Sequence, residues 1–253
     1  MSPHLQSFSD PAPPLAGAAI LAQQWRLLTF VHWRVDPELV APLMPAGTSP
    51  DVFDGSTWVG LVPFQMVGTG LGRLPRLPWL GTFAETNVRL YSVDDAGRRG
   101  VVFRSLEAAR LPVVLVARAL FGLPYTWARM RIREVDGEIR YTTARRFPGP
   151  RGVGGRIGVR PGAPLPRPEA LTRFLTNRWG LHVRHLGRTL YMPNHHGPWP
   201  LHEAELTRLD DSLVAAAGLP GLAGRAPDSV LWSPGVPVTF GPPHDARRPR
   251  RGH

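Results

Sequence analysis

The segment FAETNVRLY at positions 83–91 carries an acid, an amide, a guanidinium and a phenol at every second position. In an extended strand, alternate side chains share one face, so Glu85, Asn87, Arg89 and Tyr91 would form one polar row. A row turned inward would make a pocket floor where an acid, an amide and a cation meet. A row turned outward would face solvent, and the pattern allows both arrangements.

A lone arginine lies in an otherwise apolar segment. Arg118 interrupts the run 111–123, which has helical spacing and ends on a Gly-x-Pro turn. Burying an arginine is costly unless the guanidinium is paired. We therefore expect Arg118 to pair with a carboxylate such as Glu85 or Glu107, or to bind an anionic ligand.

The segment NHHGPWPLH at 194–202 contains neighbouring histidines. Adjacent side chains on an extended segment point to opposite sides, so the two histidines are poorly placed to share a metal, and no His-Glu-x-x-His spacing is present. We expect no metal and no cofactor, and we expect His196 and Trp199 to line a cleft. Trp58 and Phe64 would add apolar walls or belong to the ordinary core.

Composition excludes several kinds of chemistry. The chain has 30 arginines and no lysine. It has no cysteine either. Lysine Schiff bases, P-loop lysines and thiolate nucleophiles are therefore closed to its side chains. The GTGLG run at 68–72 precedes prolines rather than a helix, so we interpret it as a flexible lid or connector. No Gly-x-Ser-x-Gly elbow is present.

Charge and hydropathy bear on partners and location. The formal net charge is +11, but the arginines are scattered except in the tail around 247–251, so we expect no specific nucleic-acid partner. The longest apolar run, 111–123, is too short to cross a bilayer, and no secretory leader is visible. We expect a cytoplasmic protein with a small-molecule ligand and no membrane partner, and the oligomeric state stays open, a homo-oligomer included.

Hydrophobic periodicity and turn residues divide the chain into a flexible N-terminal arm (1–22), a single domain (23–243) and a disordered basic tail (244–253). Strands are expected at 25–35, 57–67, 83–93, 101–108, 125–135, 138–146, 181–186, 189–193, 203–209 and 230–239, and helices at 36–44, 112–121, 168–178 and 211–217. Residues 147–168 should form a long loop with a short strand near 156–160. Many strands with few helices between them indicate an α+β fold built on a mainly antiparallel sheet or barrel.

Five motifs resemble one family in the same order. They are LTFVHWRV at 28–35, DGSTWVGLVPF at 54–64, FAETNVRLY at 83–91, FGLPY at 121–125 and PWPL at 198–201. Over residues 24–240 the chain is similar to the YqjF-like family of uncharacterised bacterial proteins. That family is similar in turn to acetoacetate decarboxylase, which implies a cone-shaped, largely antiparallel β-barrel with a few flanking helices around a ligand cavity.

The same resemblance implies a site without its usual nucleophile. In the decarboxylase, an arginine-bearing helix leads to a Pro-Lys-Lys element whose first lysine forms a Schiff base and whose second lowers the pKa of the first. Arg118 matches that arginine and Pro124 that proline, but Tyr125 and Thr126 follow. Glu85 corresponds to a pocket glutamate of the decarboxylase.

Two functions are compatible with these residues. The first is a lyase- or isomerase-like enzyme that acts without covalent catalysis on a small carbonyl or carboxylate compound. In it, Glu85 is the general acid or base, Arg118 or Arg89 binds the anion, and Tyr125 donates a hydrogen bond to a developing enolate oxygen. The second is a noncatalytic binder of an apolar or acidic small molecule inside the barrel.

Overall fold

The computed structural model describes residues 5–8, 12–15, 17–71 and 81–246. Among them no helix is long and apolar enough to cross a membrane. The strands are β1 (Leu21–Val35), β2 (Thr48–Pro50), β3 (Thr57–Leu71), β4 (Phe83–Asp94), β5 (Arg99–Ala108), β6 (Tyr125–Val135), β7 (Glu138–Phe147), β8 (Gly154–Pro164), β9 (Gly180–His185), β10 (Arg188–His196), β11 (His202–Asp211), β12 (Ser229–Phe240) and β13 (His244–Asp245). The helices are α1 (Pro37–Val40), α2 (Leu111–Phe121), α3 (Ala170–Thr176) and α4 (Leu213–Ala216), with 3-10 turns η1 (Ala41–Leu43) and η2 (Leu222–Gly224).

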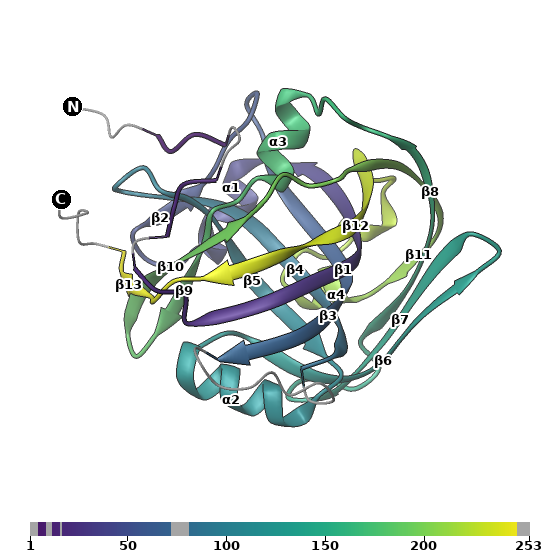
Figure 1. Ribbon diagram of the computed structural model, residues 1–253, viewed down its shortest axis with the longest axis horizontal. Coiled ribbons are helices and arrows are strands. Elements are labelled where there is room, and N and C mark those ends of the chain that lie inside the picture. Colours follow the sequence, from purple (N-terminus) through teal and green to yellow (C-terminus); the bar gives the residue numbers. More distant parts are fainter. Residues whose placement is uncertain (1–4, 9–11, 16, 72–80, 247–253) are drawn as a thin grey trace.

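The strands form one 13-stranded sheet that closes on itself (Figure 1). Their order is β13-β10-β9-β5-β6-β7-β8-β11-β12-β1-β3-β4-β2, and the additional β4–β5 and β10–β12 pairings close two rings. The first ring runs β5-β4-β3-β1-β12-β10-β9, and the second runs through β6, β7, β8 and β11 instead of β9 and β10. Among the described strands, only β5–β6 and β5–β9 pair in parallel. The expected mainly antiparallel, ringed β fold with few helices is confirmed.

Each ring has its own core, and β4 separates them. Val88 and Leu90 of β4 pack into the cluster inside the second ring, with Val59 and Leu61 of β3. Tyr91 belongs to the cluster inside the first ring, because it points to the opposite face of the strand. The side chains of the polar row on β4 are therefore turned inward, into the first ring.

Two turns lie where the sequence predicts them, one after α2 and one between β6 and β7. Gly122 closes α2 with φ 67°, and a Cβ there would lie 2.8 Å from the Arg184 carbonyl oxygen, so the position requires glycine. Asp136 and Gly137 both take positive φ and connect β6 to β7, as expected for a two-residue hairpin. Figure 1 shows α2 across one end of the barrel, near the end of β3.

Two segments differ from their predicted loops. Residues 154–164, expected in a long loop with a short strand, form β8 between β7 and β11. Their glycines serve close strand packing, because a Cβ at Gly154 would collide with the Thr143 carbonyl oxygen. Gly68 to Leu71, interpreted as a lid or connector, continue β3, and Gly72 lies outside the described residues.

Some residues near the two chain ends contact the domain. Phe8 packs edge-on against Phe174 at 5.9 Å between ring centroids, and its carbonyl accepts a hydrogen bond from Asn177. At the other end, His244 and Asp245 pair with β10. Apolar burial and backbone pairing therefore hold these residues on the domain. The arginines of the tail, from Arg247 onward, lie outside the described residues.

Candidate active site

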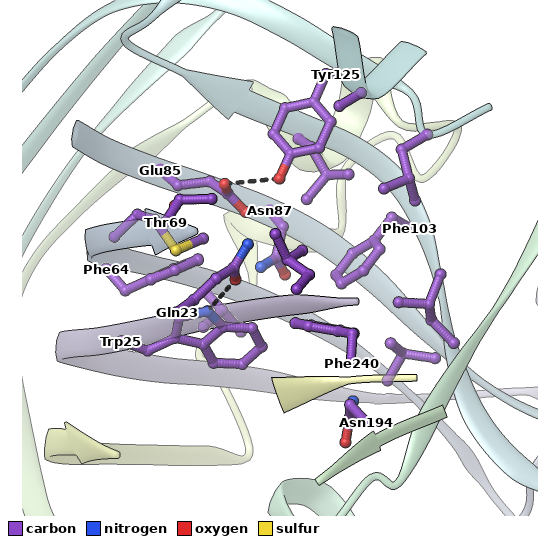
Figure 2. Close-up of a pocket in the computed structure, with 18 of the residues that line it drawn as sticks. Gln23, Trp25, Phe64, Thr69, Glu85, Asn87, Phe103, Tyr125, Asn194 and Phe240 are labelled. Atoms are coloured by element: carbon purple, nitrogen blue, oxygen red, sulfur yellow. Dashed lines mark hydrogen bonds between the residues drawn. The ribbon is translucent and has the colours of Figure 1, made fainter. Parts of the chain in front are cut away.

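A cavity of about 260 Å³ lies inside the first ring (Figure 2). Its walls come from β1, β3, β4, β5, β10 and β12, and α2 contributes Pro112, Val113, Val116, Ala117 and Phe121. Most of the lining is apolar: Val62, Phe64, Met66, Phe103, Leu106 and Phe240 surround the polar row of β4. The volume suits a small organic molecule rather than a polymer.

A carboxyl and a phenol meet at one end of the cavity, called here the acid end. The Tyr125 hydroxyl donates to Glu85 Oε2 at 2.9 Å, as Figure 2 shows, and both residues are buried. Burial raises the pKa of Glu85 to about 8; the hydrogen bond from Tyr125 opposes the rise and the charge of Glu107 adds to it. Burial and the neighbouring Glu85 raise the pKa of Tyr125 well above its usual value. Glu85 is therefore mostly protonated at neutral pH.

Strand pairing sets the geometry of the acid end. Glu85 lies on β4 between Phe64 of β3 and Ala108 of β5. Tyr125 opens β6 directly after the turn that follows α2, and it pairs in parallel with Leu106 of β5. Both residues thus lie one strand away from the end of β5, which explains how positions 40 residues apart come into contact.

Two arginines define the opposite end, called here the cationic end. Arg89 is buried, lines the cavity and donates through Nη2 to the Tyr91 hydroxyl at 3.0 Å and the Leu175 carbonyl at 2.9 Å. Its guanidinium also lies over the Tyr91 ring, 5.4 Å from the centroid. Arg178, which also lines the cavity, packs on the same ring, 4.7 Å from its centroid.

The two arginines differ in their partners. Arg178 forms an ion pair with Asp51 at 2.5 Å. Arg98, another buried arginine, likewise forms an ion pair with Asp94, at 2.7 Å. Within the described part of the chain, Arg89 forms no ion pair with a carboxylate, and its Nε has no hydrogen-bond partner. A buried guanidinium is costly without an anion. Arg89 is therefore the cation that a ligand could neutralise.

Further polar groups with incomplete hydrogen bonding line the same cavity. Asn87, two positions from Arg89 on the same face of β4, has a buried Oδ1 without a partner among the described residues, and so does Asn194 on β10. His196 lies between the rings of Trp179 and Trp199, at 4.7 and 4.8 Å. Burial lowers the pKa of His196 to about 4, so its imidazole is neutral at pH 7.

The structure places most, but not all, of the expected site residues on this cavity. Glu85, Tyr125, Asn87, Arg89, Phe64, His196 and Trp199 line it. Trp58 does not line the cavity. It is buried in the core, and the Arg34 guanidinium packs over its ring, 5.6 Å from the centroid.

Arg118 also lies elsewhere than expected. Its side chain is exposed, and its Nη1 donates to the Tyr125 carbonyl oxygen at 2.7 Å. Glu107, its other expected partner, pairs with Arg145 instead. Arg118 thus sits on the outer face of α2, where water solvates the guanidinium and no buried carboxylate is needed. The prediction that Arg118 lies beside Glu85 inside the cavity is wrong.

Several lining residues were not visible in the sequence. Arg178 follows α3 in a segment without strand alternation. Gln23 and Trp25 of β1 and Asn194 of β10 come together only through the β1–β12 and β10–β12 pairings. The Trp25 indole donates to Gln23 at 2.8 Å, which holds both at the cavity wall. Among the described residues, no three His, Asp or Glu side chains group as metal ligands.

Solved structures share this fold at low sequence identity. The enduracididine biosynthesis enzyme MppR, complexed with pyruvate, is 15% identical with a TM-score of 0.58 over 91% of this chain and 92% of that one. An acetoacetate decarboxylase-like enzyme from Sphingomonas wittichii RW1 is 16% identical with a TM-score of 0.57 over 92% of each chain. Acetoacetate decarboxylase from Legionella pneumophila is 14% identical with a TM-score of 0.56 over 93% and 91%. The likeness establishes an acetoacetate decarboxylase-like fold.

Sequence comparison points to a narrower group. The uncharacterized protein YqjF of Bacillus subtilis (strain 168) is 31% identical over 205 residues, which cover 80% of this chain and 84% of YqjF. A family model, DUF2071, described as an uncharacterized conserved protein, matches residues 22–237. This match includes most of every strand of both rings and confirms the YqjF-like resemblance. The chain belongs to the DUF2071 family of uncharacterized conserved proteins.

Proposed function

We propose that the protein is an enzyme that moves protons at a small carbonyl or carboxylate compound without forming a covalent bond to it. The observation that carries this proposal is the buried Glu85–Tyr125 hydrogen bond of 2.9 Å at the wall of a ligand-sized cavity. A carboxyl with a pKa of about 8 is a stronger base, when ionised, than an ordinary glutamate. At pH 7 about a tenth of it would be ionised.

The two groups can divide one proton transfer between them. Ionised Glu85 removes the proton on the carbon next to the substrate carbonyl, and the electron pair of that C–H bond moves onto the carbonyl oxygen as an enolate. Once protonated, Glu85 has less demand for the hydrogen bond from Tyr125, so the phenol can donate to the enolate oxygen instead. Return of the proton to the same or another carbon completes an exchange or an isomerisation.

Two further observations support a noncovalent route. Tyr125 and Thr126 follow Pro124 where a decarboxylase of the resembling kind has two lysines, and the chain has no lysine anywhere. The similar enzyme MppR has been solved with pyruvate, so this fold accommodates a small oxo acid. Arg89, a buried cation without a carboxylate partner among the described residues, would hold the acid group.

Hydrogen–deuterium exchange tests the proposal even though the natural substrate is unidentified. The protein is incubated in D₂O with pyruvate, 4-oxopentanoate and 7-oxooctanoate, and loss of the protons next to each ketone is followed by proton NMR. We expect exchange of at least one of them above the buffer rate, and a fall of about 100-fold in Glu85→Gln. The exposed Arg129→Gln serves as a matched control that leaves exchange unchanged.

The outcomes separate catalysis from binding. Exchange that persists in Glu85→Gln and in Tyr125→Phe would overturn the assigned roles. The apolar lining from Phe64, Phe103 and Phe240 favours a second candidate, a noncatalytic binder of an apolar or acidic small molecule. A ligand that stays bound through purification, detected by native mass spectrometry and unchanged on incubation, would favour the binder.

A further inference from the structure

The two polar ends of the cavity lie on one strand, four residues apart. Glu85 and Arg89 are both on β4 and both line the cavity. At the rise of an extended strand, their Cα atoms are roughly 13 Å apart. The Arg89 guanidinium is held by the Tyr91 hydroxyl and the Leu175 carbonyl, so it is directed along the strand away from Glu85. The acid end and the cationic end therefore cannot act on adjacent carbons of one ligand.

The wall between the ends is apolar. In the strand register, Val62 and Leu106 flank Asn87 on either side, while Phe64 lies beside Glu85 and Phe103 beside Arg89. All of these side chains line the cavity. Asn87 is the one polar lining residue of β4 between the two ends. A ligand that spans both ends thus needs an apolar middle.

The cationic end suits a carboxylate. Arg89 Nε and Arg178 Nη2 are buried N–H donors without hydrogen-bond partners among the described residues, and both guanidinium groups pack on the Tyr91 ring. Two donors match the two oxygens of a carboxylate.

We infer that the ligand is an elongated oxo-carboxylic acid, with its carboxylate at Arg89 and its ketone at Glu85 and Tyr125. The Cα separation of roughly 13 Å, less a hydrogen-bond contact of about 3 Å at each end, leaves at least about 7 Å of ligand between the two groups, because Arg89 is directed away from Glu85. This excludes 2-oxo and 3-oxo acids as the best-fitting ligands and favours acids in which an apolar segment of about four or five carbons intervenes. The inference rests on the proposed function, because it takes the acid end as the place where the ketone reacts.

Positional isomers test this inference by isothermal titration calorimetry. The probes are 7-oxooctanoate, its isomer 2-oxooctanoate, and 2-octanone, which lacks the carboxylate. We expect 7-oxooctanoate to bind at least tenfold more tightly than 2-oxooctanoate. Arg89→Gln should weaken 7-oxooctanoate at least tenfold and change 2-octanone less than twofold, whereas the exposed Arg129→Gln should change neither. Equal affinity for the two isomers, or equal affinity of wild type and Arg89→Gln for 7-oxooctanoate, would overturn it.

A second variant covers the case in which Arg89→Gln does not fold. Asn87→Asp keeps Arg89 and the shape of the site but places a carboxylate beside the guanidinium. It should weaken 7-oxooctanoate at least tenfold more than it weakens 2-octanone, and an equal effect on both ligands would count against the inference. Exchange measurements separate the two claims. The expected binding pattern without proton exchange would overturn the proposed function alone, while exchange with equal binding of the isomers would overturn the elongated ligand alone.

Discussion

The Tyr125 hydroxyl lies 2.9 Å from Glu85 Oε2, inside a barrel whose wall at that point is otherwise apolar. Two consequences follow from this contact. Burial keeps a proton on Glu85 near neutral pH, and the phenol limits how far the pKa rises. The pair is thus an acid–base unit whose ionisation lies within the range in which proteins work.

Removal of the phenol hydroxyl should raise the pKa of Glu85. In Tyr125→Phe the carboxylate loses a hydrogen-bond donor that stabilises its charged form, so the pKa should move above its present value of about 8. A carbon-13 NMR titration of the Glu85 carboxyl, which needs no turnover, should show its midpoint at higher pH in Tyr125→Phe than in wild type. A midpoint that stays in place or moves toward lower pH would show that the phenol does not stabilise the ionised carboxyl.

Glu85→Gln should change how stability depends on pH. The pKa of Glu85 is about 8 in the folded state and 4.5 when unperturbed, so between these values the folded protein binds the extra proton. Stability therefore falls as pH rises from about 4.5 to about 8. Glutamine cannot titrate, so the stability of the variant should not fall over this pH range. At pH 8.5 its free energy of unfolding should exceed that of wild type by on the order of 4 kcal/mol.

Urea unfolding at pH 4 and pH 8.5 measures the effect. At pH 4 both proteins carry a neutral side chain at position 85, and their free energies of unfolding should agree to within about 1 kcal/mol. The same difference between wild type and Glu85→Gln at both pH values would mean that the carboxyl does not titrate in this range.

Acid should destabilise the protein through His196. Its pKa is lowered from 6.5 to about 4 by burial between two tryptophans, so the unfolded chain takes up the proton first as pH falls. The contribution of His196 is present above pH 6.5 and is lost as pH falls toward 4. His196→Phe should reduce the stability difference between pH 7 and pH 5 by about 2 kcal/mol, measured by urea unfolding. An unchanged difference would argue against a buried neutral imidazole.

The β1–β12 contact that closes the barrel depends on a glycine. Gly235 has φ +118°, and a Cβ there would overlap the Trp25 carbonyl oxygen. Gly235→Ala should therefore cost at least about 3 kcal/mol in the free energy of unfolding. Gly224→Ala, where nothing lies within 4 Å of the added methyl, should stay within about 0.5 kcal/mol of wild type. Similar losses in both variants, measured by urea unfolding, would show that the close approach does not matter.

Much of the fold could be read from periodicity and turn residues. Alternation on β4 and the Asp136-Gly137 hairpin are local signals, and both appear as expected. The strand 154–164 could not be read, because its glycines mimic a loop in sequence while serving close strand packing in space. The closure of two rings through β4–β5 and β10–β12 depends on pairings between distant segments, which local patterns do not encode.

Local sequence patterns likewise predict only some of the residues of the candidate site. Glu85, Asn87 and Arg89 share a face because of strand geometry, so alternation alone predicts that they lie together. Arg118 was expected inside because its helix is apolar, but one side of that helix is exposed, at Leu115 and Leu120, and leaves the guanidinium in water. Arg178 reaches the cavity only through tertiary packing on Tyr91.

The titration of Glu85 itself tests the central claim most directly. Carbon-13 NMR of protein labelled at the glutamate carboxyl carbons, with Glu85→Gln to assign the signal, follows this group alone. A midpoint near pH 8 is expected for the buried carboxyl that Tyr125 contacts. A midpoint near the unperturbed value of 4.5 would contradict the assignment of Glu85 as the proton carrier of the cavity.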